Sequence, residues 1–137
     1  MSASLVGSEM CIRDRSLKIR AKAVKNLILQ MKDNNRKRAI QADSIHAEIQ
    51  RSPYPVIVCG DFNDTPASYT YHRVKKGLTD GFQDVGNGYQ YTFRQLYRLW
   101  RIDYVFYSES LKGQDCFSPD VSYSDHNMVV WRGCVKN

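Results

Sequence analysis

The chain has 137 residues, of which 42% are hydrophobic and 25% charged, which suits one globular domain and leaves no room for two. No run of about 18 apolar residues predicts a membrane-spanning helix, and no basic start followed by an apolar stretch predicts an export signal. The net charge of +6 is local, because Lys and Arg crowd the segment from Lys18 to Arg38, where only Asp33 opposes them.

The first fifteen residues do not resemble a protein segment. Residues 5–15 read LVGSEMCIRDR, which resembles the conceptual translation of a transposase adapter used to prepare sequencing libraries. We therefore predict that residues 1–15 are a non-native, disordered tail, and that authentic sequence begins near Ser16, in the middle of a gene. We expect the natural N-terminus to be missing, so the cellular location stays open.

Two helices are predicted next. The first carries an apolar stripe at helical spacing, formed by Val24, Leu27, Ile28 and Met31. A turn is predicted at residues 33–35, because Asp and Asn bond their own backbone there. The second helix ends before Ser52 and Pro53; its apolar face consists of Ala42, Ile45 and Ile49.

A short apolar run, residues 55–60, predicts a strand that is buried on both faces. Cys59 within it is interpreted as a small buried residue. A loop is predicted from Gly60 to Pro66. A disulfide between Cys116 and Cys134 stays open, because spacing alone does not fix cysteine connectivity.

The remaining elements are shorter. A helix is predicted over 69–76 with Gly77 as its stop, followed by a turn at 86–88. Strands are predicted over 89–93, 102–107 and 128–131. Helices followed by a buried strand and further strands predict a mixed α/β layered fold.

Polar clusters lie at the ends of three predicted strands. Asp61 and Asn63 follow the buried strand within the sequence GDFN. A carboxylate at the exit of a strand faces a cleft while the strand holds it rigidly. An ordinary turn rich in Asx residues stays open as the alternative.

The second cluster is Asp103 within RIDYVF, where a carboxylate in an apolar strand needs a donor. An imidazole or a nearby Arg would satisfy it. The third cluster, Asp125 and His126 within SDH, precedes the last predicted strand. It would suit a site that needs both a metal-facing oxygen and a proton-bearing ring, and a surface turn is its alternative.

In this order and spacing, GDFN, RIDYVF and SDH resemble the C-terminal half of the endonuclease/exonuclease/phosphatase superfamily. The resemblance runs from about Leu17 to the C-terminus. It implies part of a four-layer α/β sandwich, in which two packed mixed β-sheets are flanked by helices, with residues 16–137 as a partial domain. It also implies a divalent-metal-dependent phosphoester hydrolase.

The resemblance implies a role for each matching residue. Asp61 would orient and deprotonate the attacking water, and Asn63 would hold that water or a phosphate oxygen. Asp125 and Asp61 would contact Mg²⁺ or Mn²⁺. His126 would donate to the phosphate, and Asp103 would hold its ring as the imidazolium, because a neighbouring carboxylate raises a histidine pKa.

Two further residues are weaker candidates, since Arg94 and Tyr69 would contact substrate. The substrate is a phosphate ester of nucleic acid, a phospholipid headgroup or a sugar, and no obligate protein partner is evident. His46 and His72 are interpreted as structural.

The family's metal-ligating Glu has no counterpart in this sequence. The three glutamates, Glu9, Glu48 and Glu109, occupy none of the expected positions. We therefore expect the chain itself to be an inactive fragment. The alternative function is a non-catalytic module that binds nucleic acid or anionic lipid through the basic helices at 18–38.

Overall fold

The computed structural model describes residues 34–94 and 98–136. Contacts divide the chain into two compact units, Met1–Arg38 and Ala39–Asn137. The predicted adapter-derived tail, the first helix and most of the basic segment lie outside the described residues. Among the described residues, no helix has the length and apolar content needed to cross a bilayer.

Residues 34–51 are helical, which confirms the second predicted helix. The turn predicted at Asn34 and Asn35 is wrong, since both residues are helical. The helix propensity of Asn is lower than that of Ala by less than about 0.7 kcal/mol, which is too little to end a helix. Asn35 Oδ1 also accepts a hydrogen bond from the Arg38 guanidinium one turn later.

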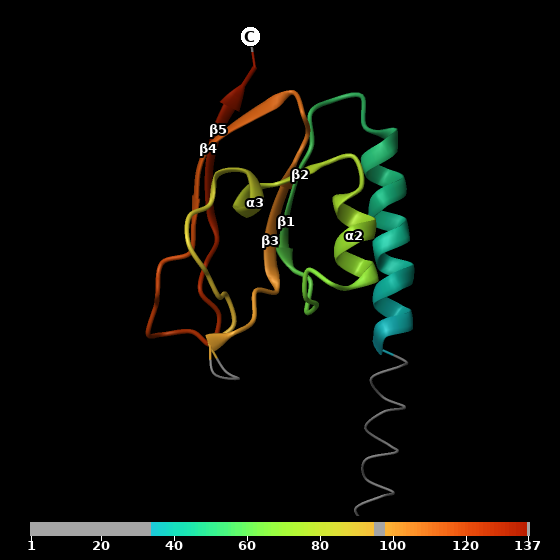
Figure 1. The fold of residues 1–137 in the computed structure, drawn as a ribbon. Coiled ribbons are helices and arrows are strands. Elements are labelled where there is room, and N and C mark those ends of the chain that lie inside the picture. Colours follow the sequence, from blue (N-terminus) through green and yellow to red (C-terminus); the bar gives the residue numbers. More distant parts are fainter. Residues whose placement is uncertain (1–33, 95–97, 137) are drawn as a thin grey trace, which may run out of the picture. The chain divides into compact units, whose positions relative to one another are not determined.

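The first sheet has three antiparallel strands in the order β1-β3-β2 (Figure 1). These are β1 (Ile57–Asp61), β3 (Asp103–Tyr107) and β2 (Thr79–Asp80). The strand predicted at 55–60 is confirmed, but it runs on through Asp61, so this residue belongs to the strand and not to the loop.

One face of this sheet packs against helical residues 39–51 and α2 (Tyr69–Lys75). Aromatic rings dominate the contact, and Tyr71 lies 4.9 Å from Tyr104 between ring centroids. The core cluster comprises Ala42, Tyr71, Val74, Tyr104 and Phe106. On the helix His46 is buried while Ile45 is 37% exposed, so the predicted apolar face is rotated slightly.

The helix predicted at 69–76 is confirmed as α2. Ser68 caps it by accepting a hydrogen bond from the amide of Tyr71, as N-cap serines do. Gly77, at φ +84°, lies just beyond the C-cap, in the left-handed conformation that glycine adopts without strain.

The second sheet pairs β4 (Leu111–Phe117) with β5 (Val130–Val135), again antiparallel. β4 was not predicted, because Gly113 and Asp115 interrupt its alternation at a register shift. The strand predicted at 128–131 is found two residues later, as β5. The strand predicted at 89–93 is wrong, since only Phe93 there forms isolated bridges, to Trp100 and His126.

A short helix, α3 (Gly81–Val85), follows β2 and was also not predicted. Asp80 caps it by accepting from the amides of Phe82 and Gln83. The Asp80 carboxylate, which is 1% exposed, further accepts from the Arg101 guanidinium at 3.2 and 3.1 Å and from Tyr71 Oη at 2.6 Å. These bonds tie β2, α3, α2 and the entry to β3 together.

The prediction that β1 is buried on both faces is wrong. Ile57 is 51% exposed and Cys59 is exposed, because helical residues 39–51 and α2 cover only the opposite face of β1. Cys59, Cys116 and Cys134 are all free, so Cys116 and Cys134 form no disulfide. Taken together, helices packed on antiparallel sheets confirm the predicted α/β class.

Candidate active site

Strand register brings two of the predicted carboxylates to the same end of the first sheet. Asp61 is the last residue of β1, Asp103 is the first residue of β3, and the two are direct partners across the antiparallel pair. The pairing continues one step further, as the Phe62 amide donates to the Ile102 carbonyl at 2.9 Å. Side chains on paired positions share a face, so both carboxylates lie on the face away from α2 and helical residues 39–51.

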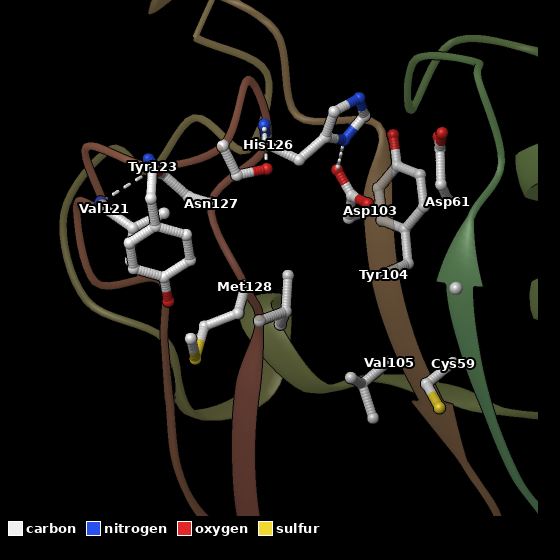
Figure 2. A pocket seen from close by; sticks show the side chains of 13 residues that line it. Cys59, Asp61, Asp103, Tyr104, Val105, Val121, Tyr123, His126, Asn127 and Met128 are labelled. Carbon is white, nitrogen blue, oxygen red and sulfur yellow. Dashed lines mark hydrogen bonds and ion pairs between the residues drawn. The ribbon is translucent and has the colours of Figure 1, made fainter.

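His126 completes the cluster from the segment before β5. Its Nδ1 lies 3.0 Å from Asp103 Oδ2, so the ring nitrogen donates to the carboxylate (Figure 2). Ligand atoms of Asp61, Asp103 and His126 all lie within 4.8 Å of one another. Of the partners predicted for Asp103, the imidazole is therefore the one found, while Arg101 pairs with Asp80 instead.

The surroundings of His126 favour its cationic form. Partial burial lowers the pKa of His126, but the hydrogen bond to Asp103 and the negative charges of Asp103, Asp61 and Asp125 together raise it by more. The net effect is a pKa above the ordinary histidine value. The ring therefore stays protonated over a wider pH range than a free imidazole.

These groups lie at the rim of an open cleft of about 420 Å³. Asp61 and Asp103 enter it from β1 and β3, and His126 enters from the facing segment. Farther from the carboxylates, Val105 and Cys59 lie opposite Met128 and Tyr123. The cleft therefore has a charged rim and an apolar interior.

Asn63 is bound to Asp61. Its backbone amide donates to Asp61 Oδ1 at 2.7 Å, and its side-chain amide donates to Oδ2 at 3.0 Å. Its φ of 50° is a left-handed conformation that Asn tolerates better than most residues. The segment after β1 is thus an Asx turn, and this turn fixes the direction of the Asp61 carboxylate.

The other predicted site residues do not join the cluster. Asp125 is exposed and lies outside the group of nearby ligand atoms, so it acts on His126 through its charge. Arg94 Nη1 lies 3.5 Å from Asp120 Oδ1, and Tyr69 Oη donates to Asp43 at 2.7 Å. Neither Arg94 nor Tyr69 lines the cleft.

Two buried polar residues that the sequence did not single out support the site. Thr92 is 1% exposed, and its hydroxyl accepts from the amides of Ile102 and Asp103. Asn127, 2% exposed, accepts from the amide of Val121 and so closes the loop that carries His126. Burial of a polar residue next to a charged motif is a signal that appears only once the structure is known.

An imidazole held by a carboxylate, beside a second carboxylate at the mouth of a cleft in an α/β fold, is typical of a hydrolase. Residues 17–126 match the model of the Endonuclease/Exonuclease/phosphatase family. The chain therefore belongs to this family of phosphoesterase-type hydrolases.

Solved structures agree on the fold. An endonuclease/exonuclease/phosphatase from Bacteroides vulgatus is 25% identical, with a TM-score of 0.63 over 72% of this chain and 44% of that one. A conserved protein from Enterococcus faecalis is 22% identical, with a TM-score of 0.66 over 74% and 46%. A mannosyl-6-phosphatase from Bacteroides thetaiotaomicron is 23% identical, with a TM-score of 0.53 over 70% and 44%.

This chain thus spans less than half the length of the solved structures that it matches. No curated protein matches it.

Proposed function

We propose that Asp61, Asp103 and His126 belong to the active site of a divalent-metal-dependent phosphoester hydrolase. The observation that carries this proposal is the convergence of the hydrogen-bonded Asp103–His126 pair and the Asp61 carboxylate within 4.8 Å at the cleft rim. Family membership supports the same chemistry.

In this proposal His126 stabilises the phosphate as negative charge develops on it. Asp103 accepts from Nδ1 and leaves Nε2 to donate to a phosphate oxygen. A phosphate ester is anionic, so attack by a nucleophile needs a nearby positive charge to offset the growing repulsion. The raised pKa of His126 favours the cationic form of the ring.

Asp61 acts as the base that orients and deprotonates the attacking water. Both of its oxygens accept from Asn63, yet each carboxylate oxygen has a second lone pair for water. Because the Asx turn fixes the carboxylate, Asn63 contributes by orienting the base. The Asn63 Oδ1 atom remains able to accept from the same water.

The donor set suits Mg²⁺ or Mn²⁺, which prefer oxygen ligands and keep several waters. Asp61 is the exposed carboxylate of the cluster and would hold the ion, with Asp125 as a predicted outer ligand. A bound ion would supply positive charge to the phosphate and lower the pKa of a bound water. One carboxylate and waters bind such an ion weakly, so we expect little or no activity from this chain alone.

The proposal is tested with Mn²⁺ on the chain itself. Paramagnetic broadening of NMR signals should be strongest around Asp61 and should disappear in Asp61→Asn. Any Mn²⁺-dependent hydrolysis of bis-p-nitrophenyl phosphate or p-nitrophenyl phosphate at high protein concentration should fall at least ~100-fold in Asp61→Asn and His126→Ala.

Asp43→Asn is the matched control, because Asp43 is a partly exposed carboxylate that binds Tyr69 and Arg73 away from the cleft. The proposal is wrong if the broadening is not centred on Asp61, or if Mn²⁺-dependent hydrolysis is measurable and neither Asp61→Asn nor His126→Ala changes it. Where hydrolysis is measurable, comparing nucleic acid, a phospholipid and a sugar phosphate as substrates separates the substrate classes, which share this phosphate chemistry.

A further inference from the structure

Residues 92–94 form a short segment between the two parts of the chain that supply the Asp103–His126 pair. On one side the amides of Thr92 and Phe93 donate to the Trp100 carbonyl, each at 3.0 Å. On the other side the Arg94 amide donates to the Asp125 carbonyl at 2.9 Å. The segment is therefore bonded by its backbone to both neighbours.

Thr92 makes the contacts nearest to the pair itself. Its hydroxyl oxygen accepts from the Ile102 amide at 3.0 Å and from the Asp103 amide at 3.1 Å. Its carbonyl accepts from the Asn127 amide at 2.7 Å. The Thr92 hydroxyl thus binds the Asp103 amide, and the Thr92 carbonyl binds the amide of Asn127, which directly follows His126.

We propose that Thr92 is a positioning residue, whose hydroxyl and carbonyl hold the first residue of β3 against residues 126–127 and so keep Asp103 within hydrogen-bonding reach of His126. This assignment rests on the proposed function only in that it gives the pair a catalytic purpose.

The length of the Asp103–His126 hydrogen bond explains why such a residue matters. The bond is 3.0 Å long, and N–H···O bonds weaken beyond about 3.2 Å. A displacement of Asp103 by a few tenths of an ångström would therefore weaken this bond. Loss of the threonine oxygen would leave two amides in a buried site without an acceptor. The start of β3 would then shift toward other acceptors and carry Asp103 with it.

Two variants of Thr92 distinguish loss of the hydrogen-bond acceptor from a change in side-chain volume. Thr92→Val keeps the shape and removes the acceptor, while Thr92→Ser keeps the acceptor and removes the methyl group. Thr70→Val makes the same change at another buried threonine, in α2, and is the matched control.

The readout is the tautomer of neutral His126, measured from its ring ¹⁵N shifts at a pH where the ring is uncharged in every variant. We expect the Nδ1–H form to dominate in the wild type, in Thr92→Ser and in Thr70→Val. In Thr92→Val the Nε2–H form should become the major one. Amide exchange at Ile102 and Asp103 should accelerate in Thr92→Val alone.

An unchanged tautomer in a folded Thr92→Val, or an equal change in Thr70→Val, would overturn the assignment and leave Thr92 a structural residue. If Thr92→Val does not fold, Thr92→Cys decides on the same criterion, because sulfur is a weak acceptor. No readout depends on turnover, so the proposed function can fail while this assignment stands, and the reverse also holds.

Discussion

At the scale of single residues, the carboxylates of Asp80 and Asp103 have different surroundings. Asp80 is 1% exposed, and its carboxylate accepts hydrogen bonds from Arg101, Tyr71 and the first amides of α3. Asp103 keeps one partner, His126, and lies at the rim of a cleft. The first arrangement stabilises the fold, and the second leaves a group able to react.

Replacing Asp80 with Ala should therefore destabilise the protein strongly. The change leaves the Arg101 guanidinium, 11% exposed, without its carboxylate, and such losses cost about 3–5 kcal/mol. Urea unfolding measures the change. Asp115→Ala is the control, because its partner Arg132 is 66% exposed and such a pair contributes less than about 1 kcal/mol. Equal costs for the two variants would contradict this interpretation.

The cysteines should differ in reactivity. Burial, with the nearby charge of Asp80, raises the pKa of the Cys116 thiol to about 11. At pH 8 only about one Cys116 in a thousand is then a thiolate, the reactive form. Iodoacetamide should modify exposed Cys59 and Cys134 well before Cys116, as followed by peptide mass spectrometry.

Raising the pH toward 11 should speed the modification of Cys116, and unfolding in urea should abolish the difference. Rapid labelling of Cys116 in the folded protein at pH 8 would show that the thiol is not buried.

Asp61, Asp103 and His126 could be predicted from the sequence because each lies in a motif tied to a strand end. Asp125, Arg94 and Tyr69 could not be placed in the same way. Neighbours in sequence need not share a direction in space, and Asp125 lies outside the cluster that adjacent His126 joins. Thr92 was missed because its role comes from amides ten and eleven residues away in the chain.

At the scale of elements, α2 shows how local chemistry sets a boundary. Ser68 begins the helix, and Gly77 follows its end at φ +84°. Gly77 marks this stop in the sequence, which is why the end of the helix was predicted within one residue, whereas the Ser68 cap was not predicted.

Gly77→Ala should destabilise the protein by about 1–2 kcal/mol, because a Cβ is strained in the left-handed region even where space exists. Thermal or urea unfolding measures this cost. Gly60→Ala is the control, since its φ is not positive and a Cβ there meets nothing within 4 Å. A cost no larger than that of Gly60→Ala would mean that the turn relaxes.

The strands were harder to predict than the helices. β2 has two residues and β4 carries a register shift, so neither presents the regular alternation that marks a strand. The segment at 89–93 has the composition of a strand, but Thr92 and Phe93 bond across to Trp100 without a ladder. Tertiary pairing decided both cases, and it is not visible in local composition.

At the scale of the molecule, the face of the first sheet away from α2 is partly open. Ile57 is 51% exposed on β1, and Met128 is 50% exposed across the cleft. The run at 55–60 was predicted to be buried because its residues are apolar on both sides. The prediction was right that these residues are apolar, but wrong that both faces of the strand are covered by other elements.

Such a face should promote self-association. The apparent mass from light scattering should rise with protein concentration, and Ile57→Lys should reduce the rise. Ile40→Lys is the matched control, because Ile40 is 59% exposed on the helix and away from the cleft. If the wild type is monomeric at every concentration, or both variants act alike, the open face does not drive association.

The pairing of Asp61 with Asp103 across two strands has a consequence for how this scaffold can change. The ladder brings these carboxylates together, and of the intervening residues 62–102 it is Asn63 and Thr92 that bind Asp61 and the Asp103 amide directly. Insertions in the surface turns of that stretch can reshape what reaches the cleft while the reactive groups stay in place. A single added residue inside either strand would instead turn one carboxylate to the opposite side of the sheet.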